Sequence, residues 1–150
     1  MTSMNQFLVD WCIRFLENRD TIRREIVSIG EKKENAFSIT YKSVPKQFFV
    51  VAKISSDTLN VIADQPTGIF ILNNAVNVSF VISHWHLLSK KKNMTLYFIN
   101  PFSNTDKAWI INPYVHNMVC DPESLELGIK AMAEMVEDTS EEKLQEGLQG

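Results

Sequence analysis

The sequence predicts an α+β protein with a single domain, and three observations support this. A chain of 150 residues has the length of one ordinary domain and can bury one substantial core. Its hydrophobic content of 45% and charged content of 22% are close to globular averages. Apolar residues recur with helical and strand periods in turn, which predicts the order α-β-β-β-α-β-β-α. We expect a mostly antiparallel sheet covered by helices.

The first half of the chain accounts for one helix and three strands. Apolar residues recur at helical spacing from Met4 to Ile26, behind a capping box at Ser3 and Gln6, so we expect a helix to about Ser28. Residues 36–41 alternate with period two, whereas 48–52 are apolar on both faces and indicate a strand covered on two sides. Residues 58–63 are the third strand, and 68–72 extend the sheet after a turn.

The second half begins with a helix from Asn73 or Asn74 to Leu88. Residues 95–99 and 108–111 form the next two strands, each followed by an Asn-Pro pair that ends it. Asp121 and Pro122 begin the last helix, whose apolar stripe reaches Val136. We therefore expect one domain over residues 1–138 and a polar, frayed C-terminal tail over 139–150.

The segment Ser83-His84-Trp85-His86 raises the question of a metal site. The helical spacing of the surrounding apolar residues puts the segment in a helix, where the two histidines point about 200° apart. They cannot bind one ion together there, although in a strand they would share a face. Glycines are also too scattered for a phosphate-binding loop. We expect no metal and no cofactor.

One pair of residues is a candidate for nucleophilic catalysis. Cys120 lies at the start of the last expected helix, where the thiol pKa can be lowered, and His116 precedes it by four residues. A Cys-His pair has the residue types of an activated nucleophile. The sequence identifies neither an orienting group nor an oxyanion hole, so packing or surface roles remain the alternative.

The first six elements resemble, in their order, the core of the restriction-endonuclease-like family. That resemblance implies a divalent metal held by an Asp on one strand and a Glu-x-Lys on the next. Here the Glu-x-Lys matches, 31–33 and 141–143, lie in a connection and in the tail, and Ala52 stands near the expected carboxylate. The resemblance therefore implies an inactive relative, or else a metal-dependent nuclease that uses Asp57 or Asp64.

The complete element order is similar to that of small acidic secretion chaperones of the type III class. Such chaperones are usually dimers that bind partner proteins without catalysis. Because no catalytic constellation is evident, our principal hypothesis is a non-catalytic protein-binding or assembly module, with a protein partner or self-association.

Charge is unevenly distributed along the chain. Residues 121–150 contain nine acidic and two basic residues, a balance of −7, whereas residues 1–120 contain thirteen basic and nine acidic residues, a balance of +4. This predicts either a solvated acidic helix or a basic face that binds nucleic acid. The basic face would comprise Arg19, Arg23, Lys90, Lys91 and Lys92.

The sequence also suggests where the protein resides. The N-terminus does not resemble a signal peptide, and no apolar run approaches the roughly 20 residues that span a bilayer. The two cysteines, Cys12 and Cys120, are not closely spaced and favour a reducing compartment. We expect a cytoplasmic protein with no membrane association.

Overall fold

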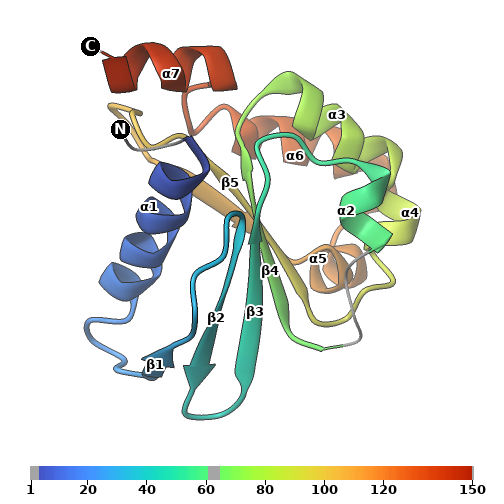
Figure 1. Ribbon diagram of the computed structural model, residues 1–150. Helices are drawn as coiled ribbons and strands as arrows, with labels where there is room; N and C mark the ends of the chain where they lie inside the picture. Colours follow the sequence, from blue (N-terminus) through green and yellow to red (C-terminus); the bar gives the residue numbers. More distant parts are fainter. Residues whose placement is uncertain (1–3, 61–64, 150) are drawn as a thin grey trace.

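The computed structural model describes residues 4–60 and 65–149, which fold into one sheet between two layers of helices (Figure 1). The strands are β1 (Ile26–Ile29), β2 (Ala36–Tyr41), β3 (Pro45–Val50), β4 (Thr67–Leu72), β5 (Met94–Ile99) and β6 (Ala108–Ile111). The helices are α1 (Met4–Arg19), α2 (Ser56–Asn60), α3 (Ala75–Ser83), α4 (Trp85–Leu88), α5 (Pro113–Val119), the 3-10 turn η1 (Pro122–Ser124), α6 (Leu125–Ala133) and α7 (Glu141–Gln149).

The sheet has six strands in the order β1-β2-β3-β4-β5-β6. Strands β1, β2 and β3 form an antiparallel meander, β3, β4 and β5 are parallel neighbours, and β5 and β6 are antiparallel. The expected mixture of α and β structure is confirmed. The expected antiparallel sheet is only partly correct, because two of the five pairings are parallel and each requires a helical crossover.

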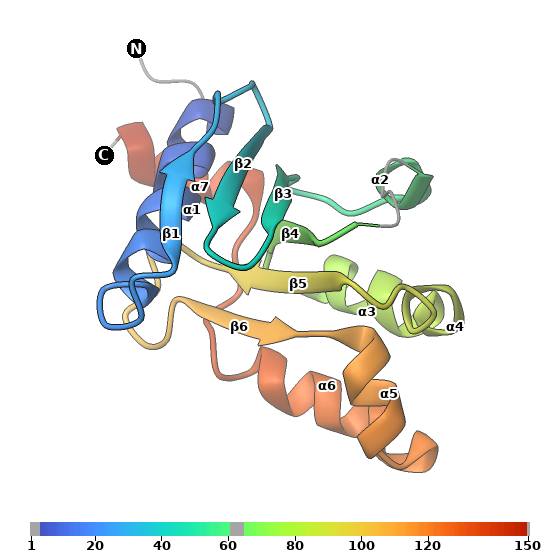
Figure 2. The same ribbon diagram turned by 90° about the horizontal axis from the view of Figure 1, so that it is seen from below.

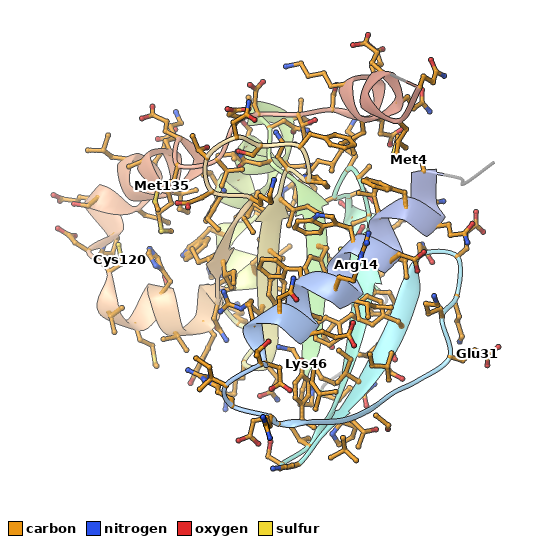
Figure 3. All side chains as sticks on the ribbon, turned by 90° about the vertical axis from the view of Figure 1, so that its left-hand side faces the viewer. Met4, Arg14, Glu31, Lys46, Cys120 and Met135 are labelled. Atoms are coloured by element: carbon orange, nitrogen blue, oxygen red, sulfur yellow. The ribbon has the colours of Figure 1, made fainter. Side chains whose placement is uncertain are left out.

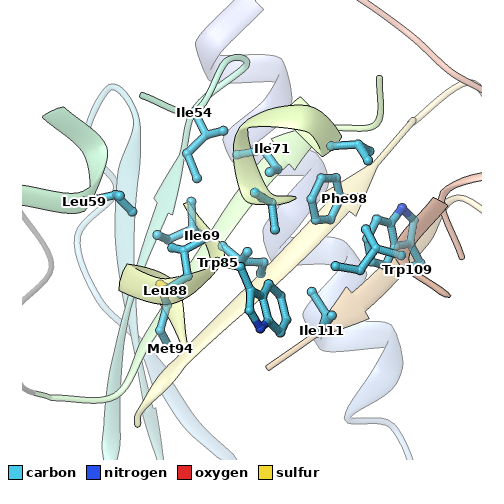
Figure 4. Close-up of a cluster of buried hydrophobic side chains, with 14 of the residues drawn as sticks. Ile54, Leu59, Ile69, Ile71, Trp85, Leu88, Met94, Phe98, Trp109 and Ile111 are labelled. Carbon is cyan, nitrogen blue, oxygen red and sulfur yellow. The ribbon is translucent and has the colours of Figure 1, made fainter. Parts of the chain in front are cut away.

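The sheet separates two hydrophobic cores. Helices α1 and α7 pack on one face, where Leu8, Cys12, Phe48 and Leu144 are buried together. The other face carries α2, α3, α4 and α6, as Figure 2 shows from below. Figure 4 shows the second core, in which Trp85 points inward. Helical cover is thus present on both faces, although only α1 and α7 serve the first one.

Amide side chains close the edge of the sheet where the parallel strands β4 and β5 end. Asn73, Asn77 and Asn100 are buried there; Asn73 and Asn100 donate to the backbone at or after the end of α6, and Asn77 donates to the backbone after β3 and at the end of β4. Asn73 Oδ1 also accepts from Trp109 Nε1 at 2.7 Å. The backbone oxygens that accept from these amides belong to Ala52, Leu72, Ala133, Val136 and Glu137.

The first helix is shorter than the sequence predicts. It ends at Arg19, and residues expected in its last turns form β1 instead. The Asp20 carboxylate explains the ending, because it accepts from the backbone N–H groups of Glu25 at 2.8 Å and Ile26 at 3.0 Å and so fixes a turn. Ile22 matched the helical period but is 93% exposed, so that match was coincidental.

Two further expectations in the middle of the chain need correction. The strand predicted at 58–63 is wrong where the structure describes it, because Ser56–Asn60 is a helical turn; residues 61–64 lie outside the described part. Thr58 Oγ1 accepts from the Ser55 N–H at the start of that turn. The helix predicted from Asn74 to Leu88 is correct in type, but it is interrupted at His84 between α3 and α4.

The C-terminal third contains two helices that the sequence interpretation missed. Asn112 and Pro113, interpreted as a strand terminator, also begin α5, because Asn112 Oδ1 accepts from the Val115 N–H at 3.1 Å. The polar segment 139–150 was expected to fray, yet it contains α7. Leu144 of α7 is fully buried in the core beneath α1, which ties this helix to the domain.

Candidate functional site

A cleft of about 670 Å³ lies at the C-terminal end of α1, on the face of the sheet that α1 covers. We call it the α1-end cleft. Helix α1, the turn that follows it, the β2–β3 hairpin and the middle of β5 all contribute to its walls. The lining residues are Leu16, Arg19, Asp20, Arg23, Glu25, Tyr41, Ser43 and Tyr97.

The turn after α1 holds the charged side of this cleft in place. Asp20 anchors the turn through its two bonds to backbone N–H groups, and Arg24 has a left-handed backbone with φ of 51°. A non-glycine residue with positive φ is uncommon and marks a tight turn. Arg19 precedes Asp20 in the sequence and Arg23 follows it, and both are exposed residues that line the cleft.

Stacked aromatic rings form a floor beneath the cleft, in which Tyr97 lines the cleft and Phe70 and Phe48 are fully buried. Tyr97 of β5 stacks on Phe70 of β4, with ring centroids 4.3 Å apart. Phe48 of β3 approaches the same rings because Gly68 lies between them without a side chain. A Cβ atom at Gly68 would lie 2.6 Å from the Phe48 ring and 3.1 Å from the Tyr97 ring. Glycine at this position therefore permits the close approach of the two rings.

Lys46 lies beside these aromatic rings and is a third cation near the cleft. Its Nζ lies 5.3 Å from the Phe48 ring centroid and 5.9 Å from that of Tyr97, within the range of cation–π attraction. Figure 3, which looks onto α1, shows Lys46 near the C-terminal end of this helix. Burial lowers the pKa of the Lys46 ammonium, because the charged form loses solvation.

The two tyrosines of the cleft are proton donors at neutral pH. Burial raises the pKa of Tyr97 to about 12, with Tyr41 adding to the increase and Arg19 opposing it. Burial also raises the pKa of Tyr41, and the nearby Asp20 carboxylate contributes. Together with the guanidinium groups, these phenols give the cleft a set of donors that suits an anion.

The raised pKa of Tyr97 predicts a pH dependence of stability. Above about pH 10 the unfolded chain loses the phenol proton while the folded chain retains it, so the free energy of unfolding falls as pH rises toward 12. Between about pH 9 and pH 11, the wild-type protein should lose about 1 kcal/mol more than Tyr97→Phe. Urea unfolding of both proteins across this range measures the difference. If the free energies of unfolding of the two proteins fall in parallel as pH rises, the prediction is wrong.

A second candidate surface lies on α5. Val115, Met118 and Val119 are 47%, 63% and 78% exposed, and separations of three and four residues place them on one face of the helix. We call these three residues the α5 surface. The other side of α5 packs inward, with the His116 ring against Trp85 at 5.7 Å and Asn117 accepting from Trp85 Nε1 at 2.9 Å.

The structure separates the five residues of the expected basic face. Arg19 and Arg23 line the α1-end cleft. Lys90, Lys91 and Lys92 follow α4, on the opposite side of the sheet from α1, as Figures 1 and 2 show. Lys92 Nζ instead lies 6.0 Å from the Tyr114 ring centroid of α5. These five cations therefore do not form one surface for a phosphate backbone.

His116 and Cys120 lie on or just after α5, but no hydrogen bond in the described structure joins their side chains. Cys120 Sγ donates to the Asp121 backbone oxygen at 3.5 Å. His116 Nε2 is buried without a hydrogen-bond partner, and its ring packs edge-on against Trp85. The geometry does not bring the thiol and imidazole together as a nucleophile pair.

The carboxylates considered for a nuclease are also dispersed. Asp57 is exposed in the first turn of α2, and Asp64 lies outside the described residues. Over residues 4–60 and 65–149, no group of three or more His, Cys, Asp and Glu side chains is placed to hold a metal ion. His84 stacks on Phe80 with ring centroids 3.9 Å apart, whereas His86 is exposed.

A further cleft of about 480 Å³ lies at the carboxyl edge of the parallel strands, between α3 and α6. Ligands often bind at this edge in open α/β sheets. Here Asn73 and Asn74, which line the cleft, already bond backbone groups with their amides. The polar groups at this edge hold the fold together, so the α1-end cleft is the stronger candidate site.

Sequence reasoning identified the two arginines of the α1-end cleft but missed Tyr41, Lys46 and Tyr97. All three face α1 because of the strand register, in which Lys46 pairs with Ile39 and Tyr97 pairs with Phe70. Lys46 lies before the strand expected at 48–52, next to Pro45, so no local signal in the sequence indicated that it would face α1.

Comparison with protein-family models, with curated proteins and with solved structures gave no match. Within the described residues, no helix is both long and apolar enough to cross a membrane.

Proposed function

We propose that this chain is a non-catalytic binding and assembly module that pairs with a second copy of itself through the α5 surface. The observation that carries the proposal is a helix whose solvent side is apolar and uncharged. Val115, Met118 and Val119 lie together on that side. Exposed apolar residues that cluster, unlike scattered ones, typically mark an interaction site.

The absence of charge favours a second copy as the partner. No Asp, Glu, Lys or Arg occurs from Ala108 to Cys120, a segment that includes all of α5. In a two-fold symmetric dimer the same surface meets itself, so a charged surface would place like charges together. An uncharged apolar helix face meets its own copy without that cost. Met118 adds a flexible thioether that adapts to an opposing surface.

The size of the α5 surface predicts a weak association. Three side chains from each copy would lose their remaining exposed area, which contributes several kcal/mol before the entropy cost of association is subtracted. We therefore expect a dissociation constant between roughly 1 µM and 1 mM. Association driven by apolar contact should persist at high salt, because screening weakens only charged interactions.

Replacement of Val119 by glutamate should convert the dimer to a monomer. Val119 is the most exposed residue of the α5 surface, and in a symmetric dimer the two new carboxylates would face one another. Sedimentation velocity over a concentration series, at low and high salt, measures the monomer fraction. We expect the dissociation constant of Val119→Glu to increase at least tenfold.

Val76→Glu is a matched control, because Val76 is 58% exposed on another helix, α3, and lies outside the α5 surface. It should associate as the wild-type protein does. A wild-type protein that stays monomeric at millimolar concentration contradicts the proposal. So does a Val119→Glu protein that associates normally.

The compartment is part of the same proposal. The described cysteines are free thiols, with Cys12 buried in the core beneath α1 and Cys120 partly exposed near α5. Free thiols persist in a reducing compartment such as the cytoplasm. Cys120 lies close to the proposed interface, so a reducing agent should be present in every association measurement.

A further inference from the structure

We infer that the α1-end cleft binds the phosphate group of a small organic ligand. The inference rests on the cations and phenols that line this cleft, and it is independent of self-association through α5. The cleft and the α5 surface lie on different helices, and α1 and α5 are well separated in Figures 1 and 2.

The cations at this cleft are not used in pairing within the described structure. Its three ion pairs are formed by Lys32, Lys130 and Lys143, and none involves a cation of the cleft. Arg19 and Arg23 each present a guanidinium fork, whose geometry suits phosphate oxygens.

One of the two acidic residues of the cleft is already engaged by the backbone. Asp20 directs both carboxylate oxygens to the backbone N–H groups of Glu25 and Ile26. Glu25 is the other carboxylate of the lining. The lining thus holds two guanidinium groups and two carboxylates, of which one is bonded to the backbone, and Lys46 is a further cation beside Tyr97 but outside the lining.

The remaining hydrogen-bond donors of the cleft are the neutral phenols of two tyrosines. Tyr41 and Tyr97 keep their phenol protons, so each can donate to a phosphate oxygen without repelling it. Arg19 also lies over the Phe15 ring at 5.5 Å, a contact that restrains its guanidinium near the cleft. A restrained side chain loses less entropy on binding.

The size and charge of the cleft indicate the class of ligand. A volume of about 670 Å³ lies in the range of small-molecule sites and exceeds the space that one phosphate ion fills. A phosphate monoester carries roughly two negative charges at neutral pH and therefore suits the two arginines of the lining better than a single carboxylate does. The rest of the ligand would lie against Tyr41 and Tyr97, the aromatic residues of the lining.

The test is a ¹H–¹⁵N NMR titration of the full chain with glycerol 3-phosphate, inorganic phosphate, glycerol and sodium chloride at matched ionic strength. We expect both phosphates to shift the resonances of Arg19 and Arg23, with glycerol 3-phosphate binding more tightly, and glycerol to shift none of them. The double variant Arg19→Ala/Arg23→Ala should bind glycerol 3-phosphate at least tenfold more weakly.

Arg14→Ala is the matched control, because Arg14 is exposed on the same helix but does not line the cleft. It should bind as the wild-type protein does. Tyr97→Phe, which keeps the ring and removes the phenol donor, should weaken binding severalfold. Two results would overturn the inference by showing general charge screening. One is that sodium chloride shifts the Arg19 and Arg23 resonances as much as the phosphates do. The other is that Arg14→Ala and the double variant lose affinity for glycerol 3-phosphate equally.

Discussion

Replacement of Asn77 by alanine should lower the free energy of unfolding by about 3–5 kcal/mol. The Asn77 side chain is fully buried and donates to the backbone oxygens of Ala52 and Leu72 at 2.9 and 2.7 Å. Its Oδ1 accepts from the Ile54 N–H at 3.0 Å. Alanine removes the side-chain partner of all three backbone groups, and a buried group that loses its partner costs about 1–3 kcal/mol.

Urea unfolding followed by circular dichroism measures this loss. Asn18→Ala is the control, because Asn18 is exposed on α1 and alanine favours a helix. Its effect should stay within about 0.5 kcal/mol. A similarly small effect for Asn77→Ala would mean that water or a local rearrangement satisfies the freed backbone groups, contrary to the network described above.

Replacement of Phe70 by alanine should be comparably damaging, at about 3–5 kcal/mol. Phe70 is fully buried in the middle of the sheet and stacks on Tyr97 at 4.3 Å. It also contacts Phe48 and Phe15, with ring centroids 6.0 and 6.2 Å away. Removing this ring leaves a cavity beneath the α1-end cleft and frees Tyr97 to move.

Phe102→Ala provides the comparison for Phe70→Ala, because Phe102 is exposed and stacks only on Phe7 among the ring pairs of the described structure. Its cost should be about 1 kcal/mol. Phe70→Leu, which refills part of the cavity, should recover a large part of the stability and of phosphate binding. Equal effects for Phe70→Ala and Phe102→Ala would contradict the central position assigned to Phe70.

The elements predicted correctly from the sequence are those in which the spacing of apolar residues reflects which side chains are buried. Residues 36–41 alternate between the α1 core and the outer side, and 96–99 are apolar because helices cover both sides of β5. The helix expected around Trp85 is correct in type, and Trp85 points into the second core. In each case the hydrophobic period and the observed face agree.

The elements predicted wrongly were governed by local hydrogen bonds that the hydrophobic period does not register. Asp20 ends α1 by capping the turn, although Ile22 and Ile26 continued the helical spacing. Asn112 and Pro113 have the sequence of a helix start, but the strand before them suggested only a terminator. In α7, Leu144 is the single buried residue, and with the exposed Leu148 it gives too few apolar positions for a recognisable stripe.

The α1-end cleft could be predicted only in part. Arg19 and Arg23 are visible as cations off the apolar stripe of the first helix. Tyr41 and Tyr97 are 56 positions apart in the sequence and meet only through the order of strands β2 to β5. That order includes two parallel crossovers, which the sequence interpretation did not anticipate.

The most direct test of the account is a single NMR experiment on two surfaces. Diluting the wild-type protein should move the resonances of Val115, Met118 and Val119 and leave those of Arg19 and Arg23 in place. Adding glycerol 3-phosphate to the same sample should move the resonances of Arg19 and Arg23 and leave those of the α5 surface in place. Dilution that changes no α5 resonance, or changes those of the α1-end cleft instead, would contradict self-association through the α5 surface.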